Sequence, residues 1–142
     1  MVDIRDFTSE DIPALQKAID ADKFHTGEWK VEHFQIPGVP TKVVTDSKGP
    51  VAFVIYTNSE GWMRVSCVWA DEDVHRNARA LIAAILMMVQ TARDNGFSGI
   101  VIETSHPNLA TFLVRVFGME CSGNDYFLSI NKETKCAVHR AL

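Results

Sequence analysis

The sequence lacks the features of several large protein classes. No apolar run in its 142 residues approaches the roughly 18 residues of a membrane-spanning helix. Residues 1–5 lack the apolar segment of a secretory signal peptide, and we find no internal repeat, low-complexity tract or interdomain linker. We therefore expect one cytoplasmic domain over residues 1–142, without membrane partners, in which residues 131–142 form either a helix or a disordered tail.

Cysteine and positive charge are also scarce. The cysteines, Cys67, Cys121 and Cys136, are widely spaced and form no CxxC pair, which argues against a disulfide framework and against a metal site such as zinc. Cys67 falls in a predicted strand, where a cysteine usually acts as a small buried hydrophobic residue. The formal net charge of −4 argues against a nucleic-acid partner, because nonspecific binding rests on basic surface.

A strand over residues 2–7 is predicted to precede a helix whose start the sequence leaves open. Thr8 as the N-cap would place Asp11 three residues later, as in a variant of the capping box. Asp11 as the N-cap would instead put Pro13 inside the first turn, where proline is tolerated. An irregular stretch with a short helix at residues 28–34 follows. Three further strands are predicted over residues 41–45, 51–57 and 62–70, joined by turns into an antiparallel meander.

The most informative stretch runs from Arg64 to Met119. Its first strand and a polar corner lead into a long amphipathic helix at residues 74–95, and the apolar strand Ile100–Ile102 follows. The corner of such a βαβ unit is where phosphates are held, because unpaired N–H groups and the helix dipole meet there. The remaining predictions are a helix at residues 109–117 and a closing hairpin at 120–121 and 126–130.

The element order, β-α-(α)-β-β-β-α-β-α-β-β, resembles the GNAT fold of coenzyme-A-dependent N-acetyltransferases. Residues 4–15 are similar to the first strand and helix of that family, and residues 76–82, Arg-Asn-Ala-Arg-Ala-Leu-Ile, align with its Gly-x-Gly-x-x-Leu-Leu segment. Residues 108–119 are similar to its Asn-started helix that ends in Gly-Phe, here Gly118-Met119. The resemblance implies an α+β, mixed three-layer fold with a central mixed sheet and helices on both faces.

The resemblance also implies acetyl-CoA, or another acyl-CoA, as cofactor. Its pantetheine arm is expected to pair with the strand that splays before the long helix, and its pyrophosphate to lie at the helix start. The expected binding residues are Val68, Ala70, Arg76, Asn77, Ala78, Arg79 and Asn108. This corner departs from the family pattern, because Arg76 and Ala78 replace its two glycines and Asp73 stands where it has Arg or Gln. Arg76 and Arg79 either supply charge for phosphate or are solvated helix residues.

The catalytic residues implied by the resemblance are less well matched. The position of the usual general-acid tyrosine holds Val114. Glu103, at the end of a strand beside the expected splay, is the first candidate base, acting directly or through water, and His106 is the second. The alternatives are a Glu that caps a loop and a surface His.

Two functions follow from the resemblance. The first is an acyl-CoA-dependent N-acyltransferase, most simply an acetyltransferase, acting on an unidentified small-molecule or protein amine. The alternative is a GNAT-like protein without catalysis that serves as a binding or structural component. The glycine-poor corner from Val68 to Arg76 is similar to GNAT-like proteins of short-tailed phages, which suits the alternative. A homodimer is compatible with either function.

Overall fold

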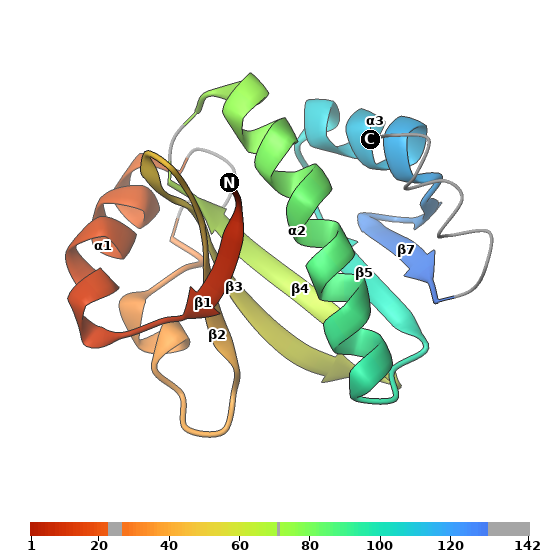
Figure 1. The fold of residues 1–142 in the computed structure, drawn as a ribbon, viewed down its shortest axis with the longest axis horizontal. Helices are drawn as coiled ribbons and strands as arrows, with labels where there is room; N and C mark the ends of the chain where they lie inside the picture. The colour runs from red at the N-terminus through yellow and green to blue at the C-terminus, as the bar shows by residue number, and fades with distance from the viewer. Residues whose placement is uncertain (23–26, 71, 131–142) are drawn as a thin grey trace. The chain divides into compact units, whose positions relative to one another are not determined.

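The computed structural model describes residues 1–22, 27–70 and 72–130, and the predicted tail lies outside them. In these residues, seven strands form one mixed sheet in the order β1-β2-β3-β4-β5-β7-β6, and three α-helices accompany it (Figure 1). This confirms the predicted α+β class. The chain divides into two compact units, one of Met1–Tyr56 with Ser66–Ala84 and one of Thr57–Val65 with the residues from Ile85 onward. The single domain over residues 1–142 stays a prediction.

The elements occur in the predicted order. The first half contains β1 (Asp3–Asp6), the 3₁₀ turn η1 (Ser9–Asp11), α1 (Ile12–Ala21), the 3₁₀ turn η2 (Val31–Phe34), β2 (Thr41–Asp46) and β3 (Gly49–Ser59). The second half contains β4 (Trp62–Trp69), α2 (Val74–Asp94), β5 (Gly99–Glu103), α3 (Pro107–Phe117), β6 (Glu120–Ser122) and β7 (Asp125–Ser129). The structure differs from the predictions for these elements only at their ends.

The first helical segment uses both of the starts that the sequence left open. The Thr8 N–H donates to Asp11 Oδ2 at 2.8 Å, and the Asp11 N–H donates to the Thr8 carbonyl at 2.9 Å, which closes η1. The α-helix α1 then begins at Ile12, with Pro13 in its first turn. Thr8 therefore begins the 3₁₀ turn, and Asp11 is the residue before the α-helix.

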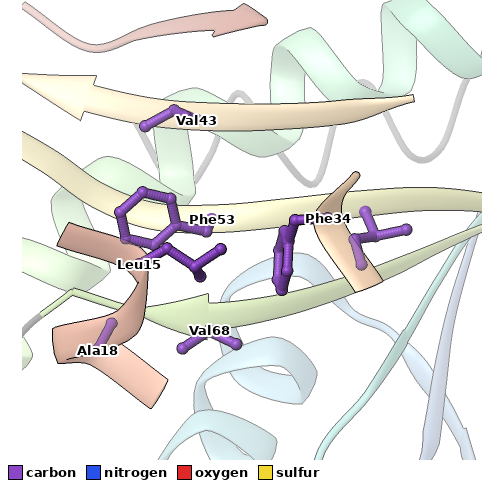
Figure 2. Packing of buried hydrophobic residues seen from close by; sticks show 7 residues of the cluster. Leu15, Ala18, Phe34, Val43, Phe53 and Val68 are labelled. Atoms are coloured by element: carbon purple, nitrogen blue, oxygen red, sulfur yellow. The ribbon is translucent and has the colours of Figure 1, made fainter. Parts of the chain in front are cut away.

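In the first unit, buried side chains lie on both faces of β3. Six consecutive residues of this strand, Val51–Tyr56, are buried, as expected for a strand with cover on both sides. Figure 2 shows the cluster on one face, where α1 and η2 contact the sheet through Leu15, Ala18, Phe34, Val43, Phe53, Ile55 and Val68. Burying each of the larger of these side chains contributes about 1.5–3 kcal/mol.

The second unit contains a point where only glycine fits. Gly99 begins β5 and pairs with Ser129 of β7, and a Cβ on Gly99 would lie 2.2 Å from the Leu128 carbonyl oxygen and 2.7 Å from Trp62 Cζ3. The Trp62 ring packs edge-on against Phe127, with ring centroids 5.3 Å apart. The missing side chain of Gly99 therefore lets β7 and Trp62 approach β5.

Candidate functional site

The start of α2 is capped by the side chain of Asp73, in the polar corner that precedes the helix. The Asp73 carboxylate accepts a hydrogen bond from the Arg76 N–H at 3.1 Å, and the Asp73 carbonyl accepts one from the Asn77 N–H at 2.9 Å. The first of these bonds is the main cause that holds the pKa of Asp73 below its usual range. Asp73 is thus an N-cap of the kind that stabilises a helix start. The Asp73 carboxylate therefore lies at the start of α2, where we expected the phosphates of the cofactor to bind.

Arg76 is buried in a set of intramolecular hydrogen bonds. Its Nε donates to Asp46 Oδ2 at 2.7 Å, and its Nη2 donates to Asp46 Oδ1 at 2.8 Å and to the carbonyls of Gly49 and Pro50 at 3.2 Å each. The first bond holds the pKa of Asp46 well below its usual range. With 8% of its surface exposed, Arg76 is not the solvated helix residue of the alternative. Phosphate binding by this guanidinium stays a prediction, and it would require breaking these bonds.

The other predicted residues of this turn differ in exposure. Asn77 and Ala78 are partly buried, and Arg79 is exposed. Arg79 can therefore reach a ligand in solvent, although its exposure suits a solvated helix residue equally well. Their roles in cofactor binding stay predictions.

The ladder between β4 and β5 uses only the first half of β4. Its parallel pairs are Met63 with Ile100, Arg64 with Val101 and Val65 with Ile102, and β4 continues past them through Ser66–Trp69. Within the described residues, the ladder has no pair beyond Val65 and Ile102. β5 itself ends one residue after the last pair, at Glu103, so the parting of the two strands expected beside the corner stays a prediction.

The backbone direction of β4 singles out residues that the sequence analysis did not name. The Ala70 N–H donates to the Val51 carbonyl at 2.8 Å, so it is turned toward β3. Backbone groups alternate in direction along an antiparallel strand, so Val68 turns the same way and Cys67 and Trp69 turn the other way. A ligand that pairs with the far edge of β4 would therefore use Cys67 and Trp69. The roles implied for Val68 and Ala70 stay predictions, and the Ala70 amide already has a partner.

Glu103 ends β5 beside an ion pair that the sequence did not predict. It is exposed and lies opposite Asp125 of β7 in the ladder. Arg64 donates from Nη1 to Asp125 Oδ1 at 3.0 Å and from Nη2 to Asp125 Oδ2 at 3.1 Å, and it also interacts electrostatically with Glu103. The bonds from Arg64 lower the pKa of Asp125. No local pattern points to this pair, because 61 positions separate its members.

His106 caps the start of α3. Its Nδ1 accepts hydrogen bonds from the N–H groups of Asn108 at 3.1 Å and Leu109 at 3.5 Å, and its own N–H donates to Thr104 Oγ1 at 3.0 Å. The Nδ1 atom of His106 therefore accepts hydrogen bonds from the backbone of α3. The sequence did not predict this role. Glu103 is the last residue of β5, His106 precedes α3, and Asn108 lies in the first turn of α3.

Neither of the two tyrosines lies at the position of the family's general acid. Tyr56 is buried, and desolvation raises its pKa to about 12, so its hydroxyl stays protonated at neutral pH. A hydrogen bond with Cys121 raises the pKa of Tyr126. Val114, at the position of the family's tyrosine, is exposed. Desolvation also raises the pKa of the half-buried Cys67 thiol to about 12, which fits the predicted non-nucleophilic role.

In residues 1–22, 27–70 and 72–130, no three His, Cys, Asp or Glu side chains are placed to hold a metal ion. In the same residues, no helix has the length and apolar character needed to cross a membrane.

Comparison with solved structures identifies the fold. A GNAT-family acetyltransferase from Staphylococcus aureus Mu50 matches with a TM-score of 0.67 and 10% sequence identity, over 92% of this chain and 100% of that chain. The aminoglycoside acetyltransferase AAC(6')-Ib in complex with coenzyme A matches with a TM-score of 0.68 and 13% identity, over 99% of this chain and 98% of that chain. This chain has the GNAT fold. A GNAT-family acetyltransferase from Brucella melitensis in complex with acetyl-CoA matches with a TM-score of 0.55 and 12% identity, over 92% of this chain and 89% of that chain.

The sequence comparisons add no closer relationship. No family model matches the chain, and no curated protein matches it. At the identities of 10–13% found for these three structures, the likeness establishes the GNAT fold alone.

Proposed function

We propose that this protein is an N-acyltransferase that uses an acyl-CoA donor, most simply acetyl-CoA, and acts on a small-molecule or protein amine. The observation that carries the proposal is the length of β4, which continues through Ser66–Trp69 after its last pair with β5, Val65 with Ile102. Strand alternation from the bond of the Ala70 amide to Val51 predicts that the backbone groups of Cys67 and Trp69 are turned away from β3, and an extended arm such as pantetheine can pair with a strand edge of this kind. The GNAT fold, shared with acetyltransferases solved with coenzyme A or acetyl-CoA, supports the same function.

The proposed reaction needs a base and a donor for the oxyanion. The amine nitrogen attacks the thioester carbonyl, a C–N bond forms, the C–S bond breaks, and the thiolate leaves. Glu103 takes the proton of the amine, directly or through a water molecule, from its exposed place at the end of β5. A backbone N–H stabilises the negative charge that develops on the carbonyl oxygen.

A second function is supported by the corner before α2. The carboxylate of Asp73 caps the helix start, and the guanidinium of Arg76 is bonded to Asp46. Neither arrangement favours a phosphate, and both suit a GNAT-fold protein that binds or supports a partner without catalysis. The predicted cytoplasmic location and homodimer are compatible with both functions and stay predictions.

Calorimetric titration with acetyl-CoA distinguishes the two functions. Micromolar binding, together with acetylation of at least one member of an amine panel seen by mass spectrometry, would support the transferase. No heat at millimolar acetyl-CoA would favour the non-catalytic protein.

The proposed base is tested by replacing Glu103. Glu103→Gln should lower the turnover number by about 10²–10⁴-fold and leave the affinity for acetyl-CoA unchanged, because general base catalysis contributes factors of that size. Glu120→Gln, at an exposed acid of β6, is the matched control and should change neither quantity. Full turnover in Glu103→Gln would remove this residue from the mechanism.

A further inference from the structure

The first turn of α2 is already occupied by an anion that belongs to the chain. A helix start binds anions because its first N–H groups have no partner within the helix. Here the Asp73 carboxylate lies 3.1 Å from the Arg76 nitrogen and accepts its hydrogen bond. A pyrophosphate that binds the same amide would have to displace the Asp73 carboxylate, which is negatively charged like the pyrophosphate.

The basic side chains near this carboxylate interact with acidic groups of the chain itself. Arg76 directs its guanidinium to Asp46 and to the carbonyls of Gly49 and Pro50, the first two residues of β3, with only 8% of its surface exposed. Of the exposed side chains at residues 72–79, Glu72 and Asp73 are acidic and Arg79 is basic, and both Arg79 and the exposed His75 interact electrostatically with Asp73. The corner therefore has a surface that repels a phosphate of two or more charges, whereas the far edge of β4 remains suited to an uncharged pantetheine arm.

We infer that this protein recognises its donor through the acylated pantetheine arm and makes little use of the nucleotide pyrophosphate, because Asp73 excludes phosphate from the first turn of α2. The inference rests on the proposed acyl transfer and extends its donor class from acyl-CoA to pantetheine thioesters with or without a nucleotide. Asp73 is the residue that determines this specificity.

Two donors that differ only in the nucleotide half test the inference. The wild-type protein should use S-acetylpantetheine and acetyl-CoA with kcat/KM values within about threefold of each other. Asp73→Asn keeps a good N-cap and removes the charge, so it should raise kcat/KM for acetyl-CoA by about tenfold and leave that for S-acetylpantetheine unchanged. Asp94→Asn, at the last residue of α2, removes the same charge and should change neither value. A wild-type preference for acetyl-CoA of tenfold or more would overturn the inference.

A binding measurement separates failure of this inference from failure of the proposed function. Inorganic pyrophosphate is titrated into ¹⁵N-labelled protein while the amide signals of His75 and Arg76 are followed by NMR. We expect no saturable shift in the wild type up to millimolar pyrophosphate and a saturable shift in Asp73→Asn. A saturable shift in the wild type, or no saturable shift in Asp73→Asn, would overturn the role of Asp73 whether or not acyl transfer occurs. If neither thioester is bound or consumed, the proposed function fails and the donor class fails with it.

Discussion

Arg76 Nε lies 2.7 Å from Asp46 Oδ2, although the two residues are 30 positions apart in the sequence. This contact joins the first turn of α2 to the end of β2, and Arg76 also donates to the carbonyls of Gly49 and Pro50 at the start of β3. A residue that stands at a phosphate-binding glycine in the family alignment thus stabilises the junction of a helix and a hairpin.

Replacing Arg76 should destabilise the protein. Arg76→Met leaves the Asp46 carboxylate and two carbonyls without their shared donor, so we expect the melting temperature to fall by roughly 5 °C. Arg79→Met, at an exposed position of the same helix, is the control and should leave it within about 1 °C. Differential scanning calorimetry measures both. Equal melting temperatures for the two variants would contradict the bridging role of Arg76.

The stability of the protein should fall in acid. Asp11, Asp46 and Asp125 each have a lowered pKa, caused first by the arginine that hydrogen-bonds to it. A carboxyl whose pKa is lowered by folding adds stability above its unfolded pKa, and this stability disappears as the pH falls toward the folded value. The free energy of unfolding, from urea titrations monitored by circular dichroism, should therefore decline as the pH falls below about pH 4.

The same titrations assign part of this decline to one pair. In Arg76→Met the carboxyl of Asp46 loses the main cause of its lowered pKa, so the decline below about pH 4 should be shallower than in the wild type. Parallel curves for the two proteins would show that this ion pair does not contribute to the acid sensitivity.

Adding one methyl group at Gly99 should disrupt the second unit. The new Cβ would meet the Leu128 carbonyl oxygen at 2.2 Å, a backbone atom that no side-chain rotation can move. We expect Gly99→Ala to cost at least about 3 kcal/mol of unfolding free energy. Gly38→Ala is the control, because its Cβ would meet nothing within 4 Å and only its φ of +80° opposes the change. A similar loss in both variants, measured by urea unfolding, would show that the close approach at β7 is not what requires glycine.

His106 should contribute to stability as a helix cap. His106→Ala removes the acceptor of two N–H groups and should lower the unfolding free energy by about 1 kcal/mol, whereas His106→Asn supplies another good cap and should change it little. Thermal unfolding of the two variants measures the difference. Equal losses would contradict the capping role, and lost turnover in a fully stable His106→Asn would instead point to the second candidate base.

The corner before α2 shows where reasoning from the sequence succeeds and where it ends. Apolar periodicity and a polar stretch placed the helix at residues 74–95, within one residue of its observed end at Asp94. The composition of the corner identified Asp73 as unfavourable for phosphate. It did not indicate that this carboxylate caps the helix, nor that the guanidinium of Arg76 binds Asp46.

The sequence by itself determined the order of helices and strands, the α+β class and the alternative caps of α1, because these depend on local propensities and on the periodicity of burial. Only the tertiary structure decided that β7 lies between β5 and β6, that Arg64 pairs with Asp125, and that the amide of Ala70, directly after β4, is turned toward β3. These features depend on strand register and on contacts between distant residues. Local patterns carry no information about either, because the same patterns are compatible with several ways of joining the elements.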